Sequence, residues 1–348
     1  MQVKKALERD WSSLLPEVLN LIAKNLNEIC DFVRFRAVCK GWRFSTPVTD
    51  LPPQFPWIIE GNINSHHSDS NLKFYSISFD KIYTIQSPKS VGKWFYCQSD
   101  GYMLAHPHLK PSQVFLLNLL NNHKITLPAF DFDGWKNWFL PSKNQTGVHA
   151  ICYVSRSRQL ISYHPGQDNW CILKLNSDIA TCKLYYLNGM VFSVETQTGV
   201  TKVKDITTGN IAFIPPINNL ERGYLEIVFS YIVDASGIIL RVMKHIQCDP
   251  NQVLFVVYQL DMDTTGSGCW VKVDNIGNQA LFIDWNACIA VRANDFAGIK
   301  RNCIYFLRTF LYGIDRIDIE TGARKHFPCP LKGSGRWFVP SLQRLWAK

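Results

Sequence analysis

Potential metal ligands are scattered along this sequence and do not fall at the spacing that a metal site needs. The closest group of three histidines is His106, His108 and His123, and no neighbouring cysteine or carboxylate completes a tetrahedral set around them. His66 and His67 lie in a polar stretch, where such side chains are normally solvated. The 11 cysteines include no Cys-x-x-Cys pair, a pattern typical of reduced thiols. We therefore expect no metal site.

Residues for covalent or acid–base catalysis are equally sparse. The sequence contains no phosphate-binding glycine loop and no Gly-x-Ser-x-Gly motif. A glycoside hydrolase would need two facing carboxylates. Two pairs qualify by residue type, Asp261 with Asp263 and Asp315 with Asp318, but their surroundings indicate turns or strand edges. We expect neither a cofactor nor a catalytic activity, and a hydrolase is the weakest alternative.

The composition indicates a folded protein rich in β-structure. Of the 348 residues, 47% are hydrophobic, 19% are charged and 13% are aromatic. Aromatic side chains pack well on pleated sheets, whereas disordered chains carry few of them. The sequence shows neither a secretory signal core nor an apolar run of about 20 residues that could span a bilayer. The expected location is the cytoplasm, the nucleus or both, without a membrane partner.

The net charge of +9 is not concentrated in any one block. Residues 1–50 contain eight Lys/Arg and six Asp/Glu, which leaves 29 basic and 22 acidic residues, or +7, for the remainder. Such a surface could attract acidic partners or nucleic acid, but the favoured interpretation is a solvated surface with a basic bias. Because the basic residues form no long run, we do not expect a nucleic-acid partner.

Residues 11–46 show the spacing of short amphipathic helices. Pro16 suits a first helical turn, and Leu19, Ile22 and Leu26 recur at helical intervals. A second periodic stretch follows Asp31, and Gly41 weakens the helix expected after it. Chains of this length rarely bury enough surface to be stable alone. The module must therefore pack against the rest of the chain or against another protein.

The motif from Leu15-Pro16 to Trp42-Arg43 resembles the F-box. F-box proteins dock on a Skp-type adaptor and, through a cullin scaffold, form SCF ubiquitin ligases. Gly41 departs from the family's usual residue and could soften the third helix. The resemblance implies seven adaptor-facing positions, namely Leu15, Pro16, Leu19, Ile22, Val38, Cys39 and Trp42.

Residues 47–70 read as a proline-rich linker, and residues 71–348 as a large β-domain. Three segments of the large domain share one pattern, in which a strand, a polar hairpin turn and a second strand end at a proline. The closing prolines are Pro128, Pro215 and Pro328. Units of about 40–45 residues are the usual length of a propeller blade. The expected fold is mainly β, a six- or seven-bladed β-propeller preceded by a small all-α module.

Three further stretches resemble plant F-box proteins that carry a KIB-type β-propeller. They are residues 57–59, residues 291–306 and residues 337–342. The best match is at 291–306, where Asp295 and Asn302 could brace a loop. The two resemblances imply a substrate-recognition subunit of an SCF-type E3 ubiquitin ligase, whose propeller binds a protein substrate that neither resemblance identifies. A binding or regulatory propeller protein outside a ligase is the alternative.

Aromatic residues beside lysines could form a recognition surface on the propeller. One group is Trp94, Phe95 and Tyr96 beside Lys93. Trp135 and Trp138 flank Lys136 in the same manner. The other interpretation is that these rings pack between the blades.

Overall fold

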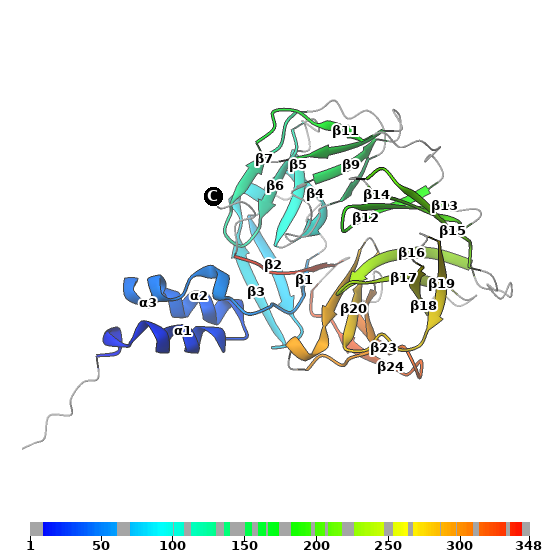
Figure 1. Cartoon of the computed structure of the whole chain (residues 1–348). Coiled ribbons are helices and arrows are strands. Elements are labelled where there is room, and N and C mark those ends of the chain that lie inside the picture. Colours follow the sequence, from blue (N-terminus) through cyan, green and yellow to red (C-terminus); the bar gives the residue numbers. More distant parts are fainter. Residues whose placement is uncertain are drawn as a thin grey trace, which may run out of the picture.

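The computed structural model describes residues 10–60, 70–99, 101–107, 113–129, 136–139, 150–154, 159–164, 166–173, 182–195, 199–205, 208–217, 226–246, 253–263, 267–285, 287–296, 298–308, 313–331 and 335–342. Three short α-helices lie near the N-terminus, and strands make up most of the other described residues (Figure 1). None of the helices in this described part is long and apolar enough to cross a membrane. The expected mainly β-fold with a small all-α module is confirmed.

The helical module consists of α1 (Pro16–Lys24), α2 (Ile29–Ala37) and α3 (Lys40–Ser45). Pro16 stands at the start of α1, where a missing N–H costs no hydrogen bond. Leu19 and Phe32 are buried inside the module. The ring centres of Phe35 and Trp42 lie 4.4 Å apart, which holds α2 against α3. Gly41 lies within α3 and does not interrupt it.

Six sheets come after the helices in the described residues, and their strands are named here from the innermost to the outermost. The first sheet contains β25 (Arg336–Phe338), β1 (Trp57–Ile59), β2 (Asn71–Ser76) and β3 (Lys81–Gln86). The second sheet contains β4 (Lys93–Ser99), β5 (Tyr102–Pro107), β6 (Phe115–Asn118) and β7 (Lys124–Thr126). The third sheet contains β8 (Lys136–Phe139), β9 (Ala150–Val154), β10 (Gln159–Tyr163) and β11 (Cys171–Leu173). The fourth sheet contains β12 (Cys182–Leu187), β13 (Met190–Glu195), β14 (Thr201–Asp205) and β15 (Ile211–Ile214). The fifth sheet contains β16 (Glu226–Ala235), β17 (Ile238–Ile246), β18 (Val253–Met262) and β19 (Gly268–Val273). The sixth sheet contains β21 (Cys288–Arg292), β20 (Gln279–Ile283), β22 (Cys303–Arg308), β23 (Gly313–Asp318) and β24 (Arg324–Pro328).

The sheets are arranged around a common axis as the blades of a propeller (Figure 1). Contacts run from β4 to β8, from β8 to β12, from β12 to β16 and from β16 to β21, so these strands form the inner ring. Five sheets are regular four-stranded antiparallel blades, fewer than the six or seven expected. The sixth departs from the pattern because it has five strands and because β20 runs parallel to β22.

The ring is closed by the pairing of the two ends of the propeller. β25 pairs with β1, with Trp57 opposite Phe338 and Ile58 opposite Trp337. The indole N–H of Trp337 also donates to the Ile283 carbonyl at 3.0 Å. Residues 57–59 are therefore a strand of the first blade, which corrects their assignment to the linker. The linker interpretation failed because a three-residue strand that follows a run of prolines shows no periodicity of its own.

The three predicted hairpins have the same turn. Asn118, Asp205 and Asp318 each accept, through the side-chain oxygen, the backbone N–H of the residue three positions later. The following residue is Asn122, Gly209 or Gly322, and each has a positive φ. Asparagine and glycine tolerate this backbone region best, which explains the shared sequence pattern. The pattern therefore marks the outermost hairpin of its blade.

The helical module packs on the outer side of the first blade, beside β2 and β3 (Figure 1). Ile29 belongs to the same apolar cluster as Trp57 and Phe74. Its backbone N–H also donates to Gln54 Oε1 at 2.9 Å. The propeller thus covers the N-terminal end of α2 and leaves the opposite end of the module exposed.

Candidate functional site

The helical module presents large apolar side chains to solvent. Leu15 is 65% exposed and Val38 is 58% exposed. Val18, Leu21 and Ile22 are also exposed, and their spacing places them on one side of α1. Exposed apolar groups that gather on one element commonly mark a protein–protein contact. We call the exposed side chains of Leu15, Pro16, Val18, Ile22 and Val38 the apolar helical face.

Six of the seven sequence-predicted residues lie at the surface of the module. Leu15, Pro16, Ile22 and Val38 are exposed, and Cys39 and Trp42 are half-buried. Leu19 is only 2% exposed, so its side chain packs inside the module and not at its surface. Periodicity identifies apolar positions but does not tell which side of a helix faces a partner. Val18 and Leu21 were missed as surface positions for the same reason.

Cys39 and Trp42 are held in place by local contacts. Cys39 caps α3, and its Sγ accepts a hydrogen bond from the Trp42 backbone N–H at 3.5 Å. The Trp42 indole N–H donates to the Trp11 carbonyl at 3.1 Å. With the Phe35 ring on one side, Trp42 is oriented before any partner arrives. A side chain ordered in advance loses less entropy on binding.

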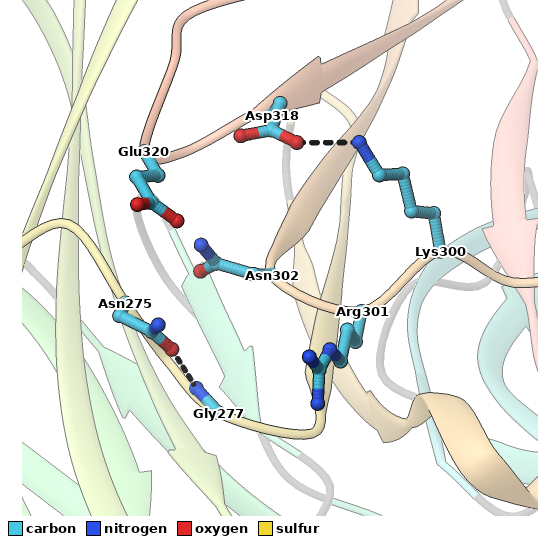
Figure 2. A pocket seen from close by; sticks show the side chains of 7 residues that line it. All are labelled: Asn275, Gly277, Lys300, Arg301, Asn302, Asp318 and Glu320. Atoms are coloured by element: carbon cyan, nitrogen blue, oxygen red, sulfur yellow. Dashed lines mark hydrogen bonds and ion pairs between the residues drawn. The ribbon is translucent and has the colours of Figure 1, made fainter.

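The sixth sheet carries a polar pocket of about 250 Å³ at the edge that includes Lys300 and Asp318 (Figure 2). These two side chains form an ion pair at 2.6 Å, and the Lys300 ammonium lowers the pKa of Asp318 to about 2. Asn302 donates to the Asp274 carbonyl at 3.0 Å and accepts from the Ile276 N–H at 3.0 Å. Its role as a loop brace, expected from the sequence, is confirmed. The pocket's polar groups hold turns together.

Three of the four carboxylates considered for catalysis, those of Asp263, Asp315 and Asp318, have other partners. Asp315 is buried, with one oxygen 2.6 Å from Arg308 Nε and the other 2.9 Å from His326 Nδ1. Asp263 Oδ1 accepts the Ser267 N–H at 2.9 Å and so closes a turn. Asp315 and Asp318 both lie on β23, which is not an inner strand.

Among the histidines and aromatic residues singled out in the sequence, those that the structure describes have local partners. His123 Nδ1 shares a hydrogen bond of 2.7 Å with the Tyr102 hydroxyl, and His106 is buried beside the Pro107 carbonyl. The described residues contain no group of three or more His, Cys, Asp or Glu side chains that could hold a metal ion. Phe95 packs in the core of the first two blades, so it is not a surface ring. His66, His67, His108 and Trp135 lie outside the described residues.

Comparison with known proteins points to one family. The model of the KIB1-4 β-propeller family matches residues 74–332. F-box protein At2g05970 of Arabidopsis thaliana is 25% identical, over 96% of this chain and 97% of its own length. F-box/kelch-repeat protein At1g57790 of the same plant is 24% identical, over 85% of this chain and 82% of its own. The similarity to F-box proteins therefore extends through both the helical module and the propeller.

Proposed function

Because this chain belongs to the KIB1-4 β-propeller family, we propose that it is a substrate-recognition subunit of an SCF-type ubiquitin ligase. Residues 11–46 would act as the F-box, and the propeller that begins at residue 57 would hold a protein substrate. The observation that carries this proposal is the apolar helical face, which stays exposed while the other end of the module packs on the propeller.

The arrangement suits a subunit that bridges two proteins. The Ile29–Gln54 hydrogen bond and the surrounding apolar cluster fix the module to the first blade. A substrate held by the propeller would therefore keep a defined distance from the adaptor. In such an assembly the chain contributes proximity and orientation, and the bond-forming chemistry belongs to other subunits.

The adaptor interface would consist of Leu15, Pro16, Ile22, Val38, Cys39 and Trp42, with Val18 added from the structure. Leu19 would support this surface from below by packing inside the module. Truncating a well-packed apolar side chain in an interface commonly costs about 2 kcal/mol or more, and a buried charge costs further. A single aspartate in this face should therefore be enough to prevent docking.

The test is co-purification with a Skp-type adaptor. We expect wild type to retain the adaptor and Leu15→Asp and Val38→Asp to lose most of it. Phe213→Asp is a matched control, since Phe213 is an equally exposed apolar residue, at 61%, on the propeller strand β15. Thermal unfolding would show that all variants remain folded. Equal recovery of adaptor by wild type and both helical variants would refute the proposal.

A further inference from the structure

Basic side chains from several blades lie against aromatic rings of the same or neighbouring sheets. The Lys183 ammonium lies 5.5 Å from the centre of the Phe229 ring, and the Lys244 ammonium lies 5.4 Å from the same ring. Lys244 also lies 4.5 Å from the centre of the Phe306 ring. β12, β17 and β22 belong to three different sheets, so Phe229 and Phe306 bring together charges that are far apart in the sequence.

Contacts also link the sixth sheet to the first two blades. Phe306 pairs in register with Ile283, and Trp285 lies two residues later. The guanidinium of Arg336 lies 5.1 Å from the centre of the Trp285 ring, and it donates to the Phe95 carbonyl at 3.0 Å. Lys93 starts the same strand as Phe95. We call Lys93, Lys183, Lys244 and Arg336 the basic rim.

Lys244 is buried and Lys183 is half-buried, and neither has an acidic partner among the described residues. Lys244 is 8% exposed, and in the described part of the chain no carboxylate pairs with it or with Lys183. Lys183 donates to the Ser230 carbonyl, at 2.7 Å. Burial lowers the pKa of both lysines, that of Lys183 to about 8. Aromatic faces offset part of the cost of burying a cation, but an anion offsets far more.

Two carboxylates of the sixth sheet, Asp284 beside β20 and Asp315 on β23, are already engaged. The two oxygens of Asp284 accept the backbone N–H groups of Trp337 and Ala287, at 3.0 and 2.8 Å. Asp315 is paired with Arg308 and His326. The rim therefore keeps an excess of positive charge, in agreement with the +7 carried by residues 51–348 (29 Lys/Arg against 22 Asp/Glu).

We propose that the basic rim binds an acidic segment of a polypeptide, with carboxylates of that segment reaching Lys183 and Lys244. The four basic residues come from four different sheets and do not converge on one point. Charges spread along an arc are matched by several carboxylates on one chain better than by a single small anion. This inference rests on the proposed function, for which it names the substrate class: a protein with an exposed acidic stretch.

The experiment measures binding of a fluorescein-labelled peptide rich in Glu and Asp to the purified full-length chain by fluorescence anisotropy. We expect saturable binding that weakens with added salt. Lys183→Met and Lys244→Met should each weaken it by about tenfold, since loss of one partner of a desolvated charge pair is costly. Lys124→Met is the matched control. Lys124 is an exposed lysine 4.3 Å from the centre of the Phe115 ring, and its loss removes the same charge away from the rim.

Three outcomes would overturn this inference: no binding of the acidic peptide, the same affinity in both rim variants as in wild type, or tighter binding of single-stranded nucleic acid than of the peptide at the same rim. Adaptor co-purification from the same preparations separates the two proposals. If the chain retains the adaptor but does not bind the peptide, the acidic substrate class alone is refuted. A chain that binds the peptide but not the adaptor refutes the ligase role alone.

Discussion

The backbone N–H of Ile29 donates to the side-chain oxygen of Gln54 at 2.9 Å, and this buried hydrogen bond joins α2 to the segment that enters the propeller. The amide group of Gln54 also donates to the Pro52 carbonyl at 2.8 Å, which fixes its orientation. An N-terminal N–H of a helix has no partner within the helix, so Gln54 supplies one. The junction between the two parts is therefore polar at its centre and apolar around it.

Replacing Gln54 by leucine should destabilise this junction. The Ile29 N–H would remain buried without an acceptor, at a cost of roughly 1–3 kcal/mol. We expect a lower midpoint of thermal unfolding and faster amide hydrogen exchange in α2. Gln113→Leu is the control because Gln113 is exposed on the propeller. Unchanged exchange in α2 would show that the apolar contacts alone hold the module in place.

Glu28 should make the protein less stable as the pH rises. Its side chain is 3% exposed, Oε1 has no hydrogen-bond partner in the described structure, and burial raises its pKa above 4.5. The folded state therefore binds the proton more tightly than the unfolded state, so stability falls as the pH rises through this range.

Glu28→Gln should accordingly stabilise the protein at neutral pH, with a gain that shrinks as the pH approaches 4.5 and below. Chemical unfolding at several pH values measures this trend. Glu17→Gln, at an exposed position in the first turn of α1, should show no such gain. A gain that grows toward acid pH would contradict the assignment.

Gly41→Ala should stabilise the helical module by about 1 kcal/mol, because alanine is the better helix former. The position has room for the change, since an added Cβ would meet only Cys39 Sγ, at 3.8 Å. The midpoint of unfolding should rise while adaptor recovery stays at least as high. A loss of stability would mean that α3 needs glycine at this position.

Substitution of Gly322 should destabilise the protein, in contrast to Gly41→Ala, because the φ of Gly322 is +68°. Gly322→Val should destabilise the propeller by about 1–2 kcal/mol. Gly322→Asn should cost much less, since Asn122 occupies the equivalent position of the β6–β7 hairpin with φ of +56°. Comparing the unfolding midpoints of the two variants tests the equivalence of these turns, and equal losses would refute it.

Lys183→Met should raise stability at neutral pH even though it weakens acidic-peptide binding. Burial lowers the pKa of Lys183 from 10.5 to about 8, so the unfolded state binds the proton more tightly than the folded state. The resulting penalty, on the order of 3 kcal/mol, is fully present below pH 8 and disappears as the pH rises toward 10.5. The facing Tyr185 and Tyr231 have pKa values raised further by burial, so they stay neutral over this range.

Unfolding curves at pH 7 and pH 10 measure this effect. The gain of Lys183→Met over wild type should be larger at pH 7 than at pH 10. Lys124→Met should show no difference between the two pH values. If the variant is less stable than wild type at pH 7, the aromatic contacts of Lys183 outweigh the cost of burying its charge.

Local features of this protein could be predicted from the sequence because they depend on neighbouring residues. The spacing of Leu19, Ile22 and Phe32 identifies helices, since residues three and four apart share one side of a helix. The three hairpin turns follow from a side-chain acceptor placed shortly before a residue that tolerates positive φ. The helices of the module and the outer hairpins of the blades therefore follow from interactions between residues that are close in the sequence.

Only the tertiary structure decided which of these residues face outward and which meet across the chain. Leu15 and Leu19 are both apolar and only four residues apart, yet one is exposed and the other buried, because Leu15 precedes α1 as its N-cap whereas Leu19 packs inside the module. The strand at residues 57–59 exists through its pairing with β25 and β2, and the basic rim exists through contacts among separate sheets. Such relationships depend on long-range contacts, which local periodicity does not encode.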